Sequence, residues 1–502
     1  MVFISNWIVA LFCFLVFIIF LCKGFYNDAS RARKTLPPSP PRFPVIGNLH
    51  QLGLHPHRSL QSLSKQYGPL LLLNLGSVPT LVVSSADAAR EVMKDHDLIF
   101  SNRPKSSMAG KVFYGPKDIA FSPYGELWRQ VRSICVLQLL SNKRVQSFRR
   151  VREEETTLMV EKIRQLGSSS SSINLSNVLL SLTNDVVCRV AMGRKYGIGE
   201  KGEKFKWLFK ELGDLLGTFC VGNYIPWLAW ISKFNGFDAR VEKVAKLFDE
   251  FLEGIVEEHR DRTNDEAGES DFVHLLLEIQ AENRAGFRLE NDVIKALILD
   301  IFAAGTDTTY TVLEWTMAEI LRHREILEKL QNEVRRIAGR KLDITEDDLE
   351  KMPYLRAVIK ESLRFHPPLP LLVPRESTQS VKLMGYDIAA GTQVLVNAWG
   401  IGRDPSLWKN PEEFHPERFF ETNIDFKGLN FEFIPFGAGR RGCPGITFAT
   451  VVNELALAKL VHKFNFALPN GGKECDMDMT EGTGLGVHKK FPVLVVATPH
   501  SC

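Results

Sequence analysis

Apolar residues recur at helical spacing along most of this chain. In the segments 141–163 and 241–259 they return every three or four positions between charged residues, which predicts amphipathic helices. The segment 291–324 is longer and more apolar, so we expect a helix whose middle is buried on nearly all sides. Short runs rich in leucine, valine and threonine predict strands at 70–75, 80–85, 392–397 and 492–498. The pattern predicts a mainly α domain with small β-sheets, and not a parallel α/β domain.

The amino-terminal end follows a different pattern. Residues 7–22 form an unbroken apolar run, and a helix over 2–22 would be about 30 Å long, enough to cross a hydrocarbon core. Basic residues follow this run between positions 23 and 34, which predicts a lumenal amino end and a cytosolic remainder. We therefore expect a retained transmembrane anchor over 1–22 and a basic linker over 23–35. A cleaved signal peptide, the alternative, usually has its charges before a shorter apolar run.

Two further segments bear on the membrane. Residues 36–49, LPPSPPRFPVIGNL, are rich in proline and predict a stiff, extended segment that packs against the domain that follows. Residues 207–234 are apolar and aromatic, with Gly and Pro interruptions. They could form a buried helix pair, but we favour a cap that dips into the membrane beside the anchor. No later linker divides the chain, so residues 36–502 are expected to form one domain.

Composition narrows the classes of function. A net charge of +3 over 502 residues gives no support for nucleic-acid binding, and we expect no nucleic-acid partner. The eight cysteines form no CxxC pair and have no histidine at zinc-finger spacing, which is typical of reduced thiols. Of these cysteines, Cys443 alone lies in an unusual local sequence.

That sequence, FIPFGAGRRGCPG at 433–445, supports more than one interpretation. Gly437, Gly439 and Gly442 match a dinucleotide-binding fingerprint if 431–436 is a strand. The fingerprint is disfavoured because Glu454 falls within a predicted helix over 446–463, and only about 60 residues remain for a nucleotide domain.

A metal-ligand interpretation of Cys443 accounts for more of the neighbouring residues. The glycines let the backbone approach a flat cofactor, and the start of the predicted helix favours a thiolate. Arg441 could reach a carboxylate of such a cofactor, with Arg440 a less certain helper. Taken by itself, the loop is also compatible with a structural cysteine in a turn.

Four other motifs occur with this loop. KESLR contains E-x-x-R at Glu361 and Arg364, FHPERF contains P-E-R-F at 416–419, AGTDTT occupies 304–309, and WRQVR contains W-x-x-x-R. The loop itself fits F-x-x-G-x-R-x-C-x-G. In their order and spacing these motifs make residues 36–502 resemble the cytochromes P450. The proline segment, the P-E-R-F element and AGTDTT are most similar to the microsomal plant branch that makes specialised metabolites.

The resemblance implies a P450 fold and a haem b cofactor whose iron is ligated by Cys443. It implies that Thr308 and Asp307 relay protons to bound oxygen. It places Glu361 and Arg364 in a buried triad with Arg418, with a structural role. The residues that it implies for haem binding are Trp128, Arg132, Arg375, Phe436, Gly439, Arg441, Cys443 and Gly445.

The implied reaction is monooxygenation, with one atom of O2 entering a small hydrophobic terpenoid, phenylpropanoid, coumarin or oxime. Electrons would come from NADPH through a separate NADPH–cytochrome P450 reductase, at the endoplasmic reticulum membrane with the catalytic domain in the cytosol. A haem protein that rearranges its substrate without NADPH and a non-catalytic, membrane-tethered carrier are the alternatives. The expected pocket walls are 101–123, 207–230, 301–309, 370–373 and 482–485.

Overall fold

The computed structural model describes residues 35–500 apart from 170–171, 197–198 and 262–269. The predicted anchor over 1–22 and all but the last residue of the predicted linker lie outside this part of the chain. Within the described residues, no helix combines the length and the apolar character needed to cross a bilayer.

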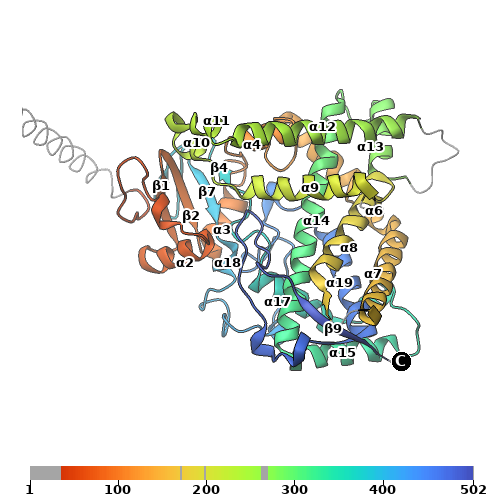
Figure 1. The fold of residues 1–502 in the computed structure, drawn as a ribbon. Coiled ribbons are helices and arrows are strands. Elements are labelled where there is room, and N and C mark those ends of the chain that lie inside the picture. Colours follow the sequence, from red (N-terminus) through yellow and green to blue (C-terminus); the bar gives the residue numbers. More distant parts are fainter. Residues whose placement is uncertain (1–34, 170–171, 197–198, 262–269, 501–502) are drawn as a thin grey trace, which may run out of the picture.

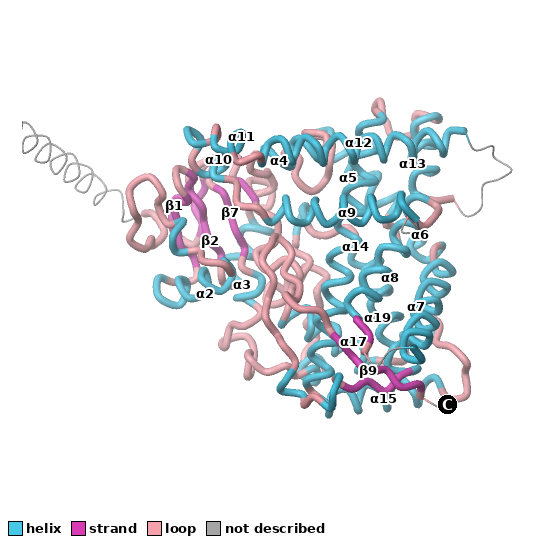
Figure 2. The backbone as a smooth tube through the Cα atoms, in the orientation of Figure 1, coloured by secondary structure: helices cyan, strands magenta, loops and turns pink. Residues whose placement is uncertain are grey.

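The described chain consists of a small sheet region and a larger helical region (Figure 1). Figure 2 shows the strands gathered mainly at one end of the molecule, while helices make up most of the rest. The main sheet has the order β1-β2-β7-β4, in which β2 and β7 run parallel and the other neighbours antiparallel. Its strands are β1 (Leu70–Leu75), β2 (Val78–Val83), β7 (Gln393–Val396) and β4 (Arg375–Glu376).

Two smaller sheets complete the β-structure of the described residues. One has the order β3-β9-β8 and the other pairs β5 with β6, all antiparallel. Their strands are β3 (Ile173–Asn174), β9 (Leu494–Pro499), β8 (Phe464–Ala467), β5 (Val381–Leu383) and β6 (Tyr386–Ile388).

Helices supply the rest of the framework. The longer ones are α2 (Pro56–Tyr67), α5 (Glu126–Ile134), α7 (Arg149–Ser169), α8 (Leu175–Met192), α9 (Gly199–Gly217), α12 (Phe237–Asp261), α13 (Phe272–Ala281), α14 (Asn291–Arg322), α15 (Arg324–Ala338), α17 (Pro353–Phe365) and α19 (Ile446–Lys463). The shorter ones are α3 (Ala86–Arg90), α4 (Ser107–Val112), α6 (Asn142–Ser147), α10 (Val221–Tyr224), α11 (Ile231–Phe234), α16 (Glu346–Leu349) and α18 (Ala398–Ile401). Single turns occur at η1 (Leu49–Gln51), η2 (Glu91–Asp95), η3 (Cys135–Leu139), η4 (Pro226–Leu228), η6 (Pro416–Phe419), η7 (Gly439–Arg441), η8 (Pro469–Gly471) and η9 (Glu474–Asp476).

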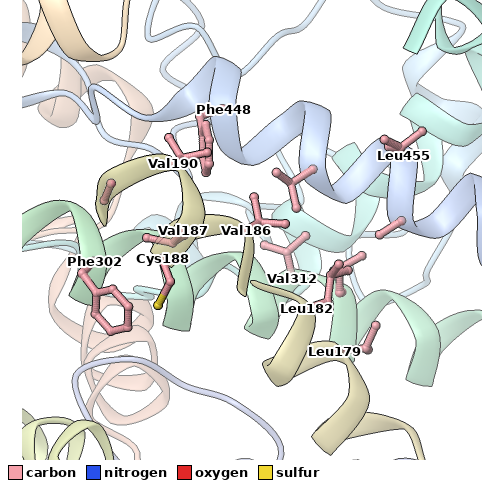
Figure 3. Packing of buried hydrophobic residues seen from close by; sticks show 14 of the residues in the cluster. Leu179, Leu182, Val186, Val187, Cys188, Val190, Phe302, Val312, Phe448 and Leu455 are labelled. Carbon is pink, nitrogen blue, oxygen red and sulfur yellow. The ribbon is translucent and has the colours of Figure 1, made fainter. Parts of the chain in front are cut away.

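The core of the helical region lies where α8, α14 and α19 meet. Figure 3 shows Val187 and Val190 of α8 near Phe302 of α14 and Phe448 of α19. Gly305 lets α8 come close to α14, because a Cβ at this position would lie 3.2 Å from a methyl of Val187. Most side chains of α14 are buried, but the burial expected for the middle of this helix is only partly right. Residues 293–300 and 311–321 are buried, whereas Ala304 and Asp307 at the centre of the helix are exposed.

Several predicted elements are confirmed, and others differ. The structure has β1 at 70–75, α19 at 446–463 and a helix over 291–322, close to the sequence-based bounds. The predicted helix over 141–163 is divided, because α6 ends at Ser147 and α7 begins at Arg149, on either side of the buried Phe148. Residues 431–436 form turns and no strand, so the strand that a dinucleotide fingerprint requires is absent from this described segment.

The proline-rich segment packs down as expected but is not straight throughout. Pro38 accepts a hydrogen bond from the backbone of Leu72 in β1, at 2.9 Å. Residues 43–47 then fold into a turn, closed by a bridge between Phe43 and Gly47. A second bridge joins Gly47 to Leu75, so this turn is attached to the end of β1.

Candidate active site

The loop before α19 holds Cys443 by backbone hydrogen bonds. The Cys443 N–H donates to the Phe436 carbonyl at 2.9 Å, which closes the loop on itself. The Gly445 N–H points at the cysteine, with 3.4 Å between the nitrogen and Sγ. Because α19 begins at Ile446, the sulfur also lies near the amino end of a long helix, as the sequence predicts. This arrangement would stabilise a thiolate at Sγ.

Cys443 is accessible and at the same time surrounded by protein. Its side chain is exposed, yet burial raises the pKa of its thiol, while the Gly445 N–H and Arg132 act in the opposite direction. The two observations agree if the sulfur faces an interior space and not the outer surface. An accessible thiol in a densely packed environment is suited to ligating a metal that is itself enclosed.

Gly439 is required by a neighbouring segment of the chain. It adopts a positive φ of 68°, and a Cβ there would lie 2.2 Å from the Met93 carbonyl oxygen. The glycine therefore lets the cysteine loop pack against η2, whereas the sequence analysis attributed it to the close approach of a cofactor. Gly437 also has a positive φ, of 66°, which a side chain would strain.

The motif residues Trp128 and Arg441 are brought together as predicted. The Arg441 guanidinium lies 4.0 Å from the centre of the Trp128 ring, an arrangement that allows a cation–π contact. Both side chains donate to the Ile119 carbonyl, at 3.1 Å each. Arg132, one turn along α5 from Trp128, donates to the Gly442 carbonyl and so binds the cysteine loop directly.

Arg103 was not identified from the sequence, although it belongs to the same group. Its guanidinium donates to the carbonyls of Ala120, Val373 and Pro374 at 2.7–2.8 Å, and it is 7% exposed. Arg375 completes the group and donates to the Ala438 carbonyl at 2.8 Å. The only sequence signal for Arg103 is a charged residue inside an otherwise ordinary loop, and surface arginines give the same signal.

The electrostatics of this arginine cluster fit an anionic group. Burial, followed by the neighbouring Arg441 and Arg375, holds the pKa of Arg103 well below its usual range. Burial and Arg375 lower the pKa of Arg441 to about 9. Neighbouring guanidiniums that lower one another's pKa in this way are stabilised by carboxylates placed between them. The two propionates of a haem would provide such carboxylates beside a cysteine ligand, so the residues present fit this cofactor.

The predicted triad is present and fully buried. Arg364 makes two hydrogen bonds of 2.8 Å to the Glu361 carboxylate, and Arg418 makes a third of 3.1 Å. The remaining donors of both arginines are satisfied by backbone carbonyls between positions 402 and 413. The triad thereby fastens the segment before the cysteine loop to α17, which agrees with the structural role expected for it.

On α14, Thr308 and Asp307 lie as the sequence suggested. The Thr308 hydroxyl donates to the Ala304 carbonyl at 2.7 Å, one turn back, and α14 continues as an α-helix through this position. Burial raises the pKa of Asp307, while His488 lowers it and Glu314 raises it further. The Asp307 side chain is nevertheless accessible, so its carboxyl, like the Cys443 thiol, faces an interior space and can hold a proton at a higher pH than an aspartate in water.

The expected wall segments meet above α14. A Cβ at Gly486 would lie 2.9 Å from Oδ2 of Asp307, which places the segment after 482–485 against this carboxyl. A Cβ at Gly217 would lie 2.9 Å from the Cα of Gly484, so the end of α9 touches the same loop. Arg103 connects the wall segments 101–123 and 370–373 through its bonds to Ala120 and Val373. Four of the five segments are therefore linked to one another or to α14.

Comparison with known proteins agrees with this geometry. A family model described as Cytochrome P450 matches residues 37–495. "Cytochrome P450 736A117" of Prunus mume is 58% identical over 97% of this chain and 95% of its own length. "Norfluorocurarine oxidase" of a Strychnos species is 56% identical, with 96% of each chain covered. "(+)-menthofuran synthase" of Mentha piperita is 54% identical over 97% of this chain and 98% of its own.

A solved structure shows the same fold. The structure titled "Zebra fish cytochrome P450 another structure with Abiraterone" superimposes with a TM-score of 0.76 at 28% sequence identity. The match covers 89% of this chain and all of the zebrafish chain.

Proposed function

This chain belongs to the cytochrome P450 family, and on that premise we propose that it is a membrane-bound haem-thiolate monooxygenase of plant specialised metabolism. The substrate we propose is a small hydrophobic metabolite of the terpenoid, phenylpropanoid, coumarin or oxime class. Electrons would come from NADPH through a separate NADPH–cytochrome P450 reductase. The observation that carries the proposal is the accessible, protein-enclosed Cys443 thiol beside a cluster of buried arginines.

Each part of the site has a separate task. When bound, haem would supply the activation of O2, with Cys443 holding its iron and the arginine cluster holding its propionates. Thr308 offers a hydroxyl on α14, and Asp307 holds a proton at a carboxyl that is accessible yet enclosed by protein. The loop at 482–488 lies against this carboxyl at Gly486 and would limit its contact with bulk water when the cofactor and substrate are bound.

Relatives support the class of substrate that we propose. Two of them are named as a norfluorocurarine oxidase and a menthofuran synthase, both from plants. The buried residues on the expected walls are mainly apolar, as in Phe113, Ile119 and Leu372, and such walls favour a hydrophobic molecule.

The face around the cysteine loop suits an acidic electron donor. Arg129, Lys143 and Arg440 are exposed there. They belong to one surface, because Arg132 of α5 bonds Gly442 and Asn142 of α6 bonds Thr447 of α19. Positive charge over the cofactor ligand would guide an acidic reductase to the shortest electron path.

The segment 219–234, which we name the aromatic cap, supports a membrane-facing orientation. Phe219, Trp227, Trp230 and Phe234 on it are 53–82% exposed. The turn between β1 and β2 joins the cap to the proline-rich segment, because Gly76 N–H donates to Ile46 and Ser77 N–H to Tyr224. Exposed aromatic residues close to the point where the described chain begins support insertion into the headgroup region beside a transmembrane anchor.

The test is a substrate screen in microsomes with a plant reductase, with products followed by mass spectrometry. Wild-type protein should show the thiolate-haem band in carbon-monoxide difference spectra and form a product one oxygen heavier. Cys443→Ala should lose the band and the product, whereas Cys475→Ala, which changes another exposed thiol, should keep both.

Two other outcomes would overturn the proposal. Turnover that persists without reductase and NADPH would indicate a haem protein that rearranges its substrate. A folded wild-type protein that lacks the difference band would indicate a carrier without haem chemistry.

A further inference from the structure

The loop 117–122 lies between α14 and the arginine cluster, and it is bonded to both. On the α14 side, Lys117 contacts Glu290 at 2.9 Å and Asp292 at 2.8 Å. Two turns further along α14, the Asp300 carboxylate oxygen Oδ2 accepts a hydrogen bond of 2.7 Å from the Ile119 N–H. The N–H of Ala120 also bonds to this carboxyl.

On the other side, the carbonyls of the same loop receive the cofactor-binding side chains. Ile119 accepts from Trp128 and Arg441 at 3.1 Å each, and Ala120 accepts from Arg103 at 2.8 Å. The Ser122 carbonyl accepts a second bond from Arg441 at 2.6 Å. The backbone units of Ile119 and Ala120 therefore bond Asp300 through their N–H groups and the arginine cluster through their carbonyls.

Asp300 has no other visible reason to be where it is. It is 5% exposed and interrupts the apolar stretch of α14 between Leu299 and Phe302. Its second oxygen, Oδ1, is buried without a hydrogen-bond partner in the described structure. A buried carboxyl costs free energy unless hydrogen bonds offset its lost hydration, and among the described residues the backbone of the loop 117–122 supplies these bonds.

We infer that Asp300 is a positioning residue that fixes the loop 117–122. Through this loop it keeps α14 and the arginine cluster in a fixed relative position. The helix that carries Asp307 and Thr308 is thereby connected by hydrogen bonds to the side chains that would bind the cofactor. The inference rests on the proposed haem site, which it deepens by assigning a role to a residue outside the family motifs.

The protonation of Asp300 sets the design of the variants. Burial and the nearby Asp118 raise the pKa of Asp300 well above its usual range. Asparagine keeps a carbonyl oxygen of the same shape and is close to a neutral carboxyl, so Asp300→Asn should preserve the loop. Valine has nearly the same volume but accepts no hydrogen bond, so Asp300→Val should leave the two N–H groups unpaired.

The experiment uses the full-length holoenzyme in nanodiscs and two readouts that do not depend on turnover. Amide hydrogen exchange is measured over 113–124, and haem loss is followed by transfer to apomyoglobin. Asp300→Val should accelerate both by about tenfold or more, while Asp300→Asn should stay within about threefold of wild type. Thr316→Val is the matched control, because Thr316 is buried on the same helix but bonds only within it, to Val312.

A double-mutant cycle tests whether the coupling passes through the loop. Trp128→Phe removes the indole donor to Ile119, so its effect on haem loss should be non-additive with that of Asp300→Val and additive with that of Thr316→Val. If Asp300→Val does not fold, Asp300→Ser replaces it, since a serine hydroxyl is too short to accept both N–H groups.

Three results would overturn the inference: unchanged exchange in Asp300→Val or its replacement, equal effects in Thr316→Val, or additivity with Trp128→Phe. The exchange readout also separates this inference from the proposed function. A wild-type protein that binds no haem would contradict the proposed function, whereas the change in loop exchange would still report on Asp300.

Discussion

The cysteine-loop side and the aromatic cap differ in the kind of side chain that each buries and exposes. Around the loop, charged residues such as Glu361, Arg364 and Arg441 are at most 8% exposed, and their hydrogen-bonding groups are paired with carboxylates and carbonyls. On the cap, large apolar side chains point outward, up to 82% exposed at Phe234. The first region buries a set of paired charges in addition to the exposed Arg129, Lys143 and Arg440, whereas the second exposes hydrophobic side chains.

The difference agrees with the proposed orientation, in which the cap meets lipid. Buried charges cost free energy unless each is paired, so the buried groups on the cysteine-loop side tolerate few arrangements. Exposed aromatic residues are favourable where water gives way to lipid, and they need no fixed partners. Substitutions should therefore lower the free energy of unfolding strongly in the first region and only slightly in the second.

The largest effect is expected at the triad. Glu361→Gln removes the charge that two buried arginines share, so the free energy of unfolding should fall by about 3–5 kcal/mol. That is a large fraction of the stability of an ordinary domain. Denaturant unfolding followed by circular dichroism measures it, and a loss below about 1 kcal/mol would contradict the account of the triad given above.

The next comparison uses two adjacent arginines. Arg441→Leu removes three bonds to the carbonyls of Ser101, Ile119 and Ser122, and should cost about 2–4 kcal/mol as well as haem affinity. Arg440→Leu changes an exposed side chain paired with Asp97 at 3.4 Å, and should cost less than about 0.5 kcal/mol. Thermal unfolding and haem titration of both variants provide the measurement. Equal effects would show that burial does not distinguish the two positions.

A pH effect is expected from His462 on α19. Burial, followed by Lys463, lowers the pKa of His462 to about 4, and neither buried ring nitrogen has a hydrogen-bond partner among the described residues. Below pH 6.5 the unfolded chain binds a proton that the folded chain excludes, so stability falls as the pH drops from about 6.5 towards 4.

Comparison with His462→Phe isolates this contribution. Between pH 7 and pH 5 the wild type should lose about 1–2 kcal/mol more than this variant, which has no group to titrate at the position. Unfolding measured at both pH values tests this, and identical pH profiles would exclude His462 as the source.

The smallest effect on stability is expected at the cap. Trp227→Ser combined with Phe234→Ser should change the free energy of unfolding by less than about 0.5 kcal/mol, since both side chains are exposed. The same change should weaken contact with lipid. In nanodiscs with brominated lipids, quenching of Trp230 fluorescence should decrease in the double variant. Unchanged quenching would indicate that the cap does not face the bilayer.

Much of the fold and part of the site followed from local pattern. The bounds of β1, α14 and α19 agree with prediction because their apolar periodicity and the residues at their ends point the same way. The break at Phe148 was missed, since the apolar spacing continues through it and only tertiary packing buries that ring between α6 and α7. Motif residues such as Glu361, Thr308 and Cys443 could be identified because their spacing is itself a local property.

Arg103 and Asp300 show the limit of the sequence. By itself it determined which segments become helices or strands, and it identified Cys443 as the candidate for a chemical role. Only the tertiary structure decided that Arg103 joins Arg375 and Arg441, and that Asp300 faces the loop 117–122. The physical reason is that helical periodicity depends on neighbours a few positions apart, whereas a buried charge depends on partners that folding brings from distant parts of the chain.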